Sequence, residues 1–420
     1  MRPGDEAAIA SALASALDGS GPGIAPVDAS LPRAPDDGGR GASGFVVSGG
    51  GRAPALGDEM VLEEETRLEE TGLEETVLAV TTSGSTGAPR MVALTADALR
   101  ASAAATQERL GGAGQWLLAL PLHHIAGLQV LSRSVLAGTE PVTLDLATSF
   151  TPEAFAAAAG RLSGPRRYTS LVPTQLHRAL ASPEGRDALA AFDAVLVGGA
   201  ATDPMLVRVA RDLGIRLTLT YGMTETAGGC VYDGEPLDGV RFRLDGDGRI
   251  HLAGPVLAAG YLGEPELTAR TFVSHDGERW LRTGDLGAVD GGELHVLGRV
   301  DDVITTGGVK VAPAAVESAL AELTEVDHAS VVGVPDPEWG AVVVAVVVLR
   351  RGAPEPSLES VRSHVAHTLG ARAAPRRVVV VPELPALGPG KVDRRAVARL
   401  AAQSAEQDRP PGSPGLPGGT

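Results

Sequence analysis

Cysteine and long apolar runs are scarce in this chain of 420 residues. The single cysteine, Cys230, excludes an intrachain disulfide and fits a reducing compartment. The longest apolar run, at 341–349, is too short to span a bilayer, and its β-branched residues favour a buried strand. The first 20 residues lack the long apolar core of a signal peptide. We therefore expect a cytoplasmic protein with no membrane partner.

Positive charge and aromatic rings are also scarce. Lys and Arg together number 36 against 52 Asp and Glu, which gives a net charge of −16. Because nucleic-acid binding needs clustered basic residues, we expect no nucleic-acid partner. Any anionic ligand must then meet a locally positive site. Aromatic residues make up 3% of the chain, which limits ring stacking in any binding pocket.

Strands and helices alternate after about residue 77, and this pattern is typical of an α/β fold. Such alternation implies a largely parallel sheet, in which ligands bind at the carboxyl ends of the strands. Thr95 is the expected N-cap of the first helix. Strands are predicted at 76–82, 115–122, 166–173, 192–200 and 215–225, and helices at 95–110, 124–138 and 174–181.

The composition divides the chain into several parts. An imperfect acidic repeat at 62–76 matches neither a helix nor a strand period, and we interpret it as a solvated connector. A metal-binding interpretation of this repeat has no other support. The chain becomes β-rich after about residue 240, and helices are predicted at 313–323 and 357–369. The expected parts are a loop-rich segment with the connector at 1–76, a large α/β domain with a β-rich subdomain at 77–298, a small α+β domain from 302 to 400 and a disordered tail at 401–420.

One loop, "TTSGSTGAPR" at 81–90, combines hydroxyl residues, glycines and Arg90 after an apolar strand. Hydroxyls and glycine N–H groups are suited to wrapping phosphate oxygens. The loop is not a Walker motif, and it lacks the first glycine of a G-x-S-x-G nucleophile elbow. Taken alone, such a loop is more often an ordinary turn.

Four further motifs follow this loop in order: "YGMTET" (221–226), "RTGDLG" (282–287), "LGRVDDVITTGG" (297–308) and "GPGKVDRRA" (388–396). With these motifs the chain resembles the adenylate-forming superfamily of acyl-CoA synthetases over about 77–400. Within it, "PLHHIAGLQVLSRSVLAG", "YTSLVPTQL" and "YGMTETAGGCVYDGEPLDGV" look most like the o-succinylbenzoate–CoA ligases of menaquinone biosynthesis. The short N-terminal part agrees with that family and argues against a long acyl tunnel.

This resemblance implies two half-reactions with ATP, Mg²⁺ and CoA. A carboxylate would attack the α-phosphate of ATP to give an acyl-adenylate and pyrophosphate, and the thiol of CoA would then displace AMP. The small domain would be mobile and would rotate between the two steps about a hinge at 299–301, which contains Asp301.

The resemblance also implies a nucleotide site. The loop at 82–87 and Arg90 would hold the β- and γ-phosphates, although the family usually has lysine at the last position. The turn at 198–200 and Tyr221 would enclose the adenine, while Asp285 and Arg299 would bind ribose and phosphate. Each group also has a purely structural interpretation. The glycines could form an ordinary turn, Arg90 could be a surface arginine, and Asp285 with Arg299 could be a weak surface ion pair. The implied nucleotide-binding residues are Thr82, Ser83, Gly84, Ser85, Thr86, Gly87, Arg90, Gly198, Gly199, Ala200, Tyr221, Gly222, Asp285 and Arg299.

By the same resemblance, four residues would act at the reacting groups. Thr224 would bind the α-phosphate, and Glu225 would be a Mg²⁺ ligand with a hard carboxylate oxygen. Lys391 would offset the charge of the transition state. His124 would gate the acyl pocket near the reacting carboxylate. In addition, Gly307 and Gly308 would border the CoA pantetheine tunnel, whereas Lys310 is interpreted as a surface residue.

The implied substrate is an aromatic dicarboxylate, so its second carboxylate needs a donor. Ala227, Gly228 and Gly229 would form the floor of the pocket, and Cys230 is interpreted as a packed thiol. Arg133 and Ser170 are the two candidates for the aromatic carboxylate, and a helix-surface charge is the competing interpretation of Arg133.

Two other functions stay open at this stage. The chain could adenylate another carboxylic acid or load a carrier protein, but no carrier domain is fused to it. It could also be a non-catalytic nucleotide-binding homologue, against which the full set of Thr224, Glu225, Asp285, Arg299 and Lys391 argues. The oligomeric state is left open, with a homodimer as one option.

Overall fold

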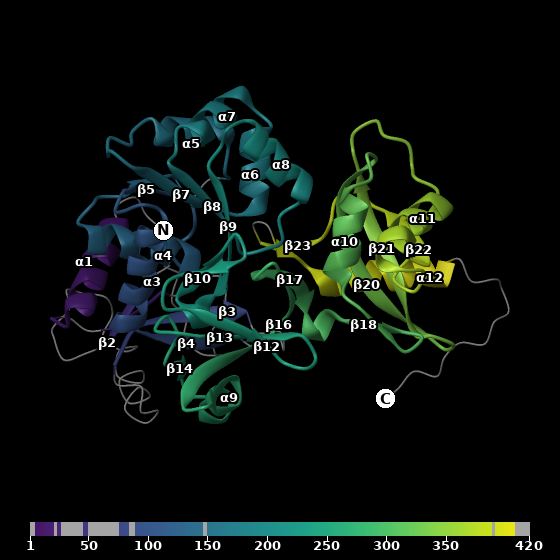
Figure 1. Ribbon diagram of the computed structural model, residues 1–420. Helices are drawn as coiled ribbons and strands as arrows, with labels where there is room; N and C mark the ends of the chain where they lie inside the picture. Colours follow the sequence, from purple (N-terminus) through teal and green to yellow (C-terminus); the bar gives the residue numbers. More distant parts are fainter. Residues whose placement is uncertain are drawn as a thin grey trace, which may run out of the picture. The chain divides into compact units, whose positions relative to one another are not determined.

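The computed structural model describes residues 5–20, 23–26, 45–48, 75–83, 89–145, 149–388 and 391–407 (Figure 1). They divide into two compact units. Unit 1 spans Met1–Thr202, Leu206–Thr283 and Val289–His295, and unit 2 spans Asp203–Met205, Gly284–Ala288 and Val296–Thr420. Within the described residues, no helix is both long and apolar enough to cross a membrane.

A seven-stranded sheet forms the centre of unit 1, in the order β11-β10-β9-β8-β7-β5-β6. The five strands from β6 to β9 are parallel, as the alternating pattern predicts, and β10 and β11 add an antiparallel edge. The strands are β5 (Gln115–Leu118), β6 (Val142–Thr143), β7 (Arg167–Leu171), β8 (Ala194–Val197), β9 (Leu217–Met223), β10 (Gly228–Tyr232) and β11 (Glu235–Pro236).

Helices cover both faces of this sheet (Figure 1). In β5, Trp116 and Leu118 pack toward α3 (Ala96–Arg109) and α4 (Ile125–Ala137), whereas Leu117 packs on the opposite face. That face is covered by α5 (Pro152–Ala159), α6 (Pro173–Leu180), α7 (Pro183–Ala190) and α8 (Pro204–Asp212). Apolar residues on both faces bury β8 completely and β5 and β7 over nearly their whole length.

A second sheet of unit 1 corrects the expected place of the strand at 76–82. This segment is part of β3 (Thr76–Ser83), which pairs antiparallel with β4 (Pro89–Thr95) and not with the parallel strands. A short connection allows an antiparallel hairpin but not a parallel crossover. The sheet has the order β14-β4-β3-β1-β2, with β1 (Gly23–Pro26), β2 (Phe45–Ser48) and β14 (Gly260–Tyr261).

The N-terminal part contains a helix where the sequence predicts loops. Helix α1 (Asp5–Asp18) buries Ile9, Leu13 and Leu17 in the same core as α4 and β3. These apolar residues repeat every four positions and so share one helix face. Alanines between them weaken the contrast that would have revealed the helix. The acidic repeat at 62–76 lies almost wholly outside the described residues.

The β-rich part after residue 240 is confirmed as a further sheet. Its order is β12-β13-β16-β15, and β17 also pairs with β16. Its elements are β12 (Arg241–Leu244), β13 (Arg249–Ala253), α9 (Pro265–Thr271), β15 (Phe272–His275), β16 (Glu278–Asp290) and β17 (Glu293–Arg299).

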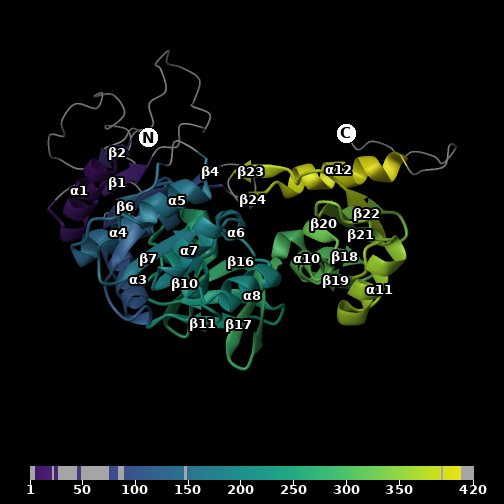
Figure 2. The same cartoon turned by 90° about the horizontal axis from the view of Figure 1, so that it is seen from above.

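Unit 2 has an α+β core, as predicted for 302–400. Helices α10 (Pro313–Ala321) and α11 (Leu358–Leu369) pack on one face of the sheet and α12 (Arg394–Gln407) on the other (Figure 2). Helix α12 continues to Gln407, so the prediction that the small domain ends at 400 and a disordered tail begins at 401 is wrong for 401–407. The helix extends because its buried Val397 and Ala401 lie one turn apart. The strands are β18 (Ile304–Thr306), β19 (Val309–Val311), β20 (Val326–Asp336), β21 (Gly340–Leu349), β22 (Arg377–Val380), β23 (Ala386–Gly388) and β24 (Lys391–Val392).

Candidate active site

A 3₁₀ turn, η1 (Thr224–Thr226), follows the carboxyl end of β9. The Thr226 hydroxyl accepts a hydrogen bond from the Met223 N–H at 2.9 Å and lies 2.7 Å from the Gly228 carbonyl oxygen. Ala227, which follows the turn, has φ of 47°. A left-handed alanine costs conformational energy, so the surrounding contacts must hold this turn in place.

The side chain of Glu225 in η1 is held by Tyr261, which belongs to another sheet. The Tyr261 hydroxyl donates a 2.7 Å hydrogen bond to Glu225 Oε1, and the Ala258 N–H donates to the Glu225 carbonyl oxygen at 2.9 Å. Burial and the Glu225 carboxylate raise the pKa of Tyr261, while the positive charge of Arg90 opposes them. Tyr261 pairs with Val92 in the β14–β4 ladder. Arg90 at the start of β4 and the carboxylate of Glu225 therefore both act on Tyr261.

The loop between β3 and β4 joins two directly opposed strand ends. The Thr82 hydroxyl donates to the Arg90 carbonyl oxygen at 3.4 Å, and the register pairs Thr82 with Arg90. Gly84, Ser85, Thr86 and Gly87, and the side chain of Ser83, lie outside the described residues. Their expected role in phosphate binding stays a prediction.

The turn after β8 needs glycine at two positions. A Cβ on Gly198 would lie 2.3 Å from Thr220 Oγ1, and Gly199 has φ of +82°. Gly222 in β9 is equally constrained, because a Cβ there would lie 2.2 Å from the Gly228 carbonyl oxygen. Ala200 is exposed and Tyr221 is half-buried. The predicted adenine-binding residues thus occur on adjacent strand ends.

His124 is the N-cap of α4, and its side chain is exposed, with its ring centroid 4.2 Å from that of His123. The helix approaches the end of β5 closely, because a Cβ on Gly127 would lie 2.3 Å from the Pro121 carbonyl oxygen. The contact at Gly127 fixes the first turn of α4, which His124 caps.

The predicted floor of the acyl pocket lies beside α4. The Gln129 side chain donates to the Ala227 carbonyl oxygen, and a Cβ on Gly228 would lie 2.9 Å from Gln129 Cγ. Gly229 is half-buried in the same strand. Cys230 is fully buried, and burial raises the pKa of its thiol to about 12, so the packed-thiol interpretation is confirmed.

The two candidates for the second carboxylate both face the α3–α4 side of the sheet. Ser170 lies in β7 two residues after Tyr168, so the two side chains share a face. Arg133 is 3% exposed and lies over the Trp116 ring, 5.1 Å from its centroid. The alternative of a helix-surface charge is therefore wrong for Arg133.

In unit 2, Asp285 and Arg299 form an ion pair, and their expected role at the ribose stays a prediction. Arg299 Nη1 lies 3.4 Å from Asp285 Oδ1, and a Cβ on Gly284 would lie 2.7 Å from Arg299 Nη2. Asp301 follows in η2 (Val300–Asp302) and is exposed. Its role as a hinge residue stays a prediction.

A positively charged cavity of about 210 Å³ lies in unit 2 next to Gly307. Arg376 and Arg372 lie 4.0 and 4.8 Å from the Trp339 ring centroid, and a Cβ on Gly307 would lie 2.2 Å from Arg372 Nη1. The indole N–H of Trp339 is buried without a hydrogen-bond partner. Gly308 has φ of +81° with open space around it.

The backbone of Lys391 lies in β24, and its side chain is outside the described residues.

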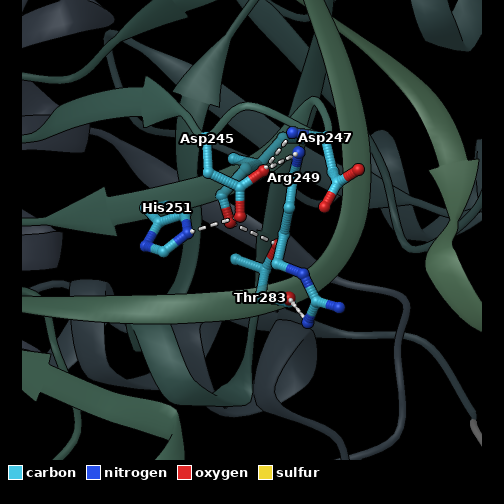
Figure 3. A network of polar contacts seen from close by, with 6 residues as sticks. Asp245, Asp247, Arg249, His251 and Thr283 are labelled. Atoms are coloured by element: carbon cyan, nitrogen blue, oxygen red, sulfur yellow. Dashed lines mark hydrogen bonds and ion pairs between the residues drawn. The ribbon is translucent and has the colours of Figure 1, made fainter.

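A polar network braces the hairpin of β12 and β13 (Figure 3). Asp245 accepts hydrogen bonds from the N–H groups of Asp247 and Arg249, and its Oδ2 lies 3.3 Å from His251 Nε2. Burial raises the pKa of Asp245, but these hydrogen bonds outweigh it and hold the pKa below its usual value. The Arg249 guanidinium donates to the Thr283 carbonyl oxygen at 3.1 Å, and so ties the hairpin to β16.

The sequence motifs assign no role to Tyr261, Gln129 or Trp339. Tyr261 and Gln129 lie 36 and 98 positions from their partners Glu225 and Ala227, so no local motif joins them. For Trp339 the sequence offers one signal, its scarcity, because the chain has three tryptophans. The structure adds that each of the three has an arginine over its ring.

Comparison with known proteins agrees with this geometry. The model of the AMP-binding enzyme family matches residues 42–262, and that of the AMP-binding enzyme C-terminal domain matches 315–391. The chain belongs to the AMP-binding enzyme family. It is 49% identical over 334 residues to a probable 2-succinylbenzoate–CoA ligase of Mycobacterium tuberculosis, covering 78% of this chain and 85% of that protein.

Two solved structures of the o-succinylbenzoate CoA synthetase of Bacillus subtilis are also similar. One holds the acyl-adenylate intermediate, with a TM-score of 0.66 at 29% identity over 77% of this chain and 69% of that chain. The other holds ATP and a magnesium ion, with a TM-score of 0.65 at 29% identity over 77% and 70%.

The donor set of this chain fits these small molecules. Glu225 and Thr224 supply oxygen atoms, the ligands that Mg²⁺ prefers. The cavity beside Gly307 supplies guanidinium groups and an aromatic face, which suit the phosphates and the base of a nucleotide such as CoA.

Proposed function

We propose that this protein is an ATP-dependent ligase that activates 2-succinylbenzoate as an acyl-adenylate and transfers it to CoA, releasing AMP and pyrophosphate. One observation carries the proposal: Thr224 and Glu225 follow the carboxyl end of β9, beside the glycine turn of β8, and Tyr261, which bonds the Glu225 carboxylate, also feels the positive charge of Arg90. Similarity to proteins named for the same substrate, over most of the chain, supports the choice of acid. A cytoplasmic location, inferred from the single cysteine, completes the proposal.

In the first half-reaction, the proposed task of these residues is to hold ATP in line with the acid. Bound Mg²⁺ would neutralise negative charge on the phosphates. Glu225 holds a carboxylate oxygen toward that cation, and the Thr224 hydroxyl binds the α-phosphate. Arg90 binds the departing pyrophosphate, and Lys391 stabilises the charge that grows on the α-phosphate as the acid attacks. Asp285 accepts hydrogen bonds from the ribose hydroxyls.

In the second half-reaction, the thiol of CoA attacks the acyl carbon and AMP leaves. Gly308, which has open space around it, leaves room for the pantetheine arm, while the missing side chain of Gly307 lets Arg372 and Trp339 pack against the backbone beside it. The arginines beside Trp339 would bind the phosphates of CoA, and the unpaired indole N–H is a donor for the same ligand. A locally positive cavity of this kind overcomes the net charge of −16 of the whole chain.

The test is pyrophosphate release with ATP, Mg²⁺ and 2-succinylbenzoate, with and without CoA. Benzoate and a medium-chain fatty acid serve as comparison acids. We expect rapid release with the diacid and a thioester product only when CoA is present. Release with another acid alone would keep the adenylation mechanism and discard this substrate. No release with any acid would favour a non-catalytic nucleotide-binding protein.

A further inference from the structure

A cluster of buried polar side chains lies between α3, α4 and the central sheet. Arg133 Nη2 donates to the Tyr232 hydroxyl at 3.4 Å, and that hydroxyl lies 3.1 Å from Thr106 Oγ1. Gln129 is one helical turn before Arg133 on α4, and Trp116 lies under the guanidinium. All five side chains are at most 3% exposed.

Three polar atoms of this cluster have no hydrogen-bond partner: Arg133 Nε, Trp116 Nε1 and Gln129 Oε1. Buried polar groups are normally paired, because each unpaired group costs about 1–3 kcal/mol. Three such atoms in one neighbourhood indicate that a polar ligand completes it. Two of them, the N–H groups of Arg133 and Trp116, are donors and therefore suit an anion.

The charge of Arg133 leads to the same conclusion. Within the described part of the chain, its guanidinium pairs with no carboxylate, and its contacts are the Tyr232 hydroxyl and the face of Trp116. A buried cation loses its hydration, and one ring and one neutral hydroxyl offset only part of that cost. An anionic group of a ligand would supply the missing counter-charge.

The position of the cluster fits the far end of the acyl pocket. Arg133 is nine residues after His124, which corresponds to about 13.5 Å along the helix axis. Helical side chains point back toward the N-terminus, so the guanidinium lies closer to His124 than its Cα does. Gln129, between them in sequence, contacts the floor at Ala227 and Gly228. The remaining span is comparable to a benzene ring carrying a four-carbon keto acid.

We propose that Arg133, held by Tyr232 and Trp116, binds the aromatic carboxylate of 2-succinylbenzoate and thereby selects a diacid. This inference rests on the proposed function. The succinyl carboxylate then lies at the His124 end of the pocket, where adenylation takes place, and the ring lies over the small residues of β10. An acid without the second carboxylate leaves the guanidinium unpaired and binds less well.

The test compares two substrates that differ only in the aromatic carboxylate, 2-succinylbenzoate and 4-oxo-4-phenylbutanoate. We expect the wild-type protein to prefer the diacid in kcat/KM for pyrophosphate release. Arg133→Met, which keeps the length of the side chain and removes its charge, is expected to lower that preference about 10- to 100-fold, the range for a hydrogen-bonded charged group. Activity with the monoacid is expected to change little. Arg186→Met, on α7, is the matched control and leaves the preference intact.

An equal loss with both substrates would mean that Arg133 only supports the fold, and the inference would be overturned. If Arg133→Met does not fold, Tyr232→Phe decides the question, because it removes the hydroxyl that accepts a hydrogen bond from the guanidinium. A reduced diacid preference in this variant supports the inference, and an unchanged preference overturns it. Failure of the proposed function looks different: the wild-type protein would then adenylate neither compound.

Discussion

At the scale of single residues, Tyr261 decides how the Glu225 carboxylate is presented. Its hydroxyl occupies Oε1 at 2.7 Å, which leaves Oε2 for a cation. Tyr261 itself is 5% exposed and is fixed by the β14–β4 ladder and by the Thr268 hydroxyl, which accepts its N–H at 2.9 Å. A metal ligand that is oriented in this way does not have to lose rotamer freedom when the metal binds.

Tyr261→Phe removes this hydrogen bond and the hydroxyl's second hydrogen bond, to Thr271, and keeps the ring in place. We expect the affinity of the protein–ATP complex for Mn²⁺, used as a probe for Mg²⁺ and titrated by electron paramagnetic resonance, to fall on the order of tenfold. Binding of ATP without metal is expected to stay unchanged. Tyr168→Phe, which removes a buried hydroxyl bonded to Leu110 and Gly112, is the control. An unchanged Mn²⁺ affinity of Tyr261→Phe would rule out this role. So would a tenfold loss of Mn²⁺ affinity when Tyr261→Phe is added to a Glu225→Gln variant, because the carboxylate is then already absent.

Residues within one motif could be predicted from the sequence, and residues between motifs could not. Thr224 and Glu225 occur together in "YGMTET", and the pair of Asp285 and Arg299 joins two adjacent motifs. Tyr261 could not be connected to Glu225, because only the antiparallel pairing of β14 with β4 brings it there. For Arg133, sequence spacing left burial and exposure equally open, and the packing of α4 on Trp116 decides between them.

At the scale of elements, the hairpin of β12 and β13 depends on a neutral His251. Its side chain is 7% exposed. Burial lowers the pKa of His251, and the positive charge of Arg243 adds to this, while the hydrogen bond to Asp245 opposes both without reversing the shift. The unfolded chain therefore takes up this proton at a higher pH than the folded protein does. Stability from this group is present above the unfolded pKa and is lost as the pH falls through the folded pKa.

His251→Asn is expected to flatten the pH dependence of stability. Between about pH 8 and pH 5, which brackets the ordinary histidine pKa, the urea midpoint of the wild-type protein should fall more than that of the variant. His275→Asn replaces a half-exposed histidine of β15 and should behave like the wild type. Equal slopes for wild type and His251→Asn would show that protonation of His251 does not limit acid stability.

The predicted elements were confirmed where their periodicity was clean. Strands β5 and β8 and helix α4, with Gly138 in the left-handed conformation after its end, follow the expected pattern. The place of β3 was wrong, because a strand's own residues do not tell which sheet it joins. Helix α1 was missed because alanine fits helices, loops and tight cores alike.

At the scale of the whole molecule, scarce residue types are concentrated where ligands are expected. The three tryptophans each contact at least one arginine. Trp116 with Arg133, and Trp339 with Arg372 and Arg376, lie at proposed anion sites. The third, Trp280 with Arg243, lies in the β-rich sheet. An acidic protein that binds ATP, CoA and a diacid needs such local positive sites. Guanidinium groups also stack on rings and fork toward carboxylates and phosphates, which suits these sites better than an ammonium group does.

Lysine is rarer still, since Lys310 and Lys391 are the two lysines of the chain. This allows a sharp test of the two half-reactions. Lys391→Ala is expected to lower pyrophosphate release with 2-succinylbenzoate about 100- to 1,000-fold, the usual cost of losing one preorganised charge-stabilising donor. Thioester formation from CoA and supplied acyl-adenylate should be retained, because that step no longer involves the triphosphate. Lys310→Ala removes the other, exposed ammonium group and should leave pyrophosphate release unchanged. If Lys391→Ala slows both steps equally, Lys391 serves the fold or a shared step, and the assignment to adenylation is wrong.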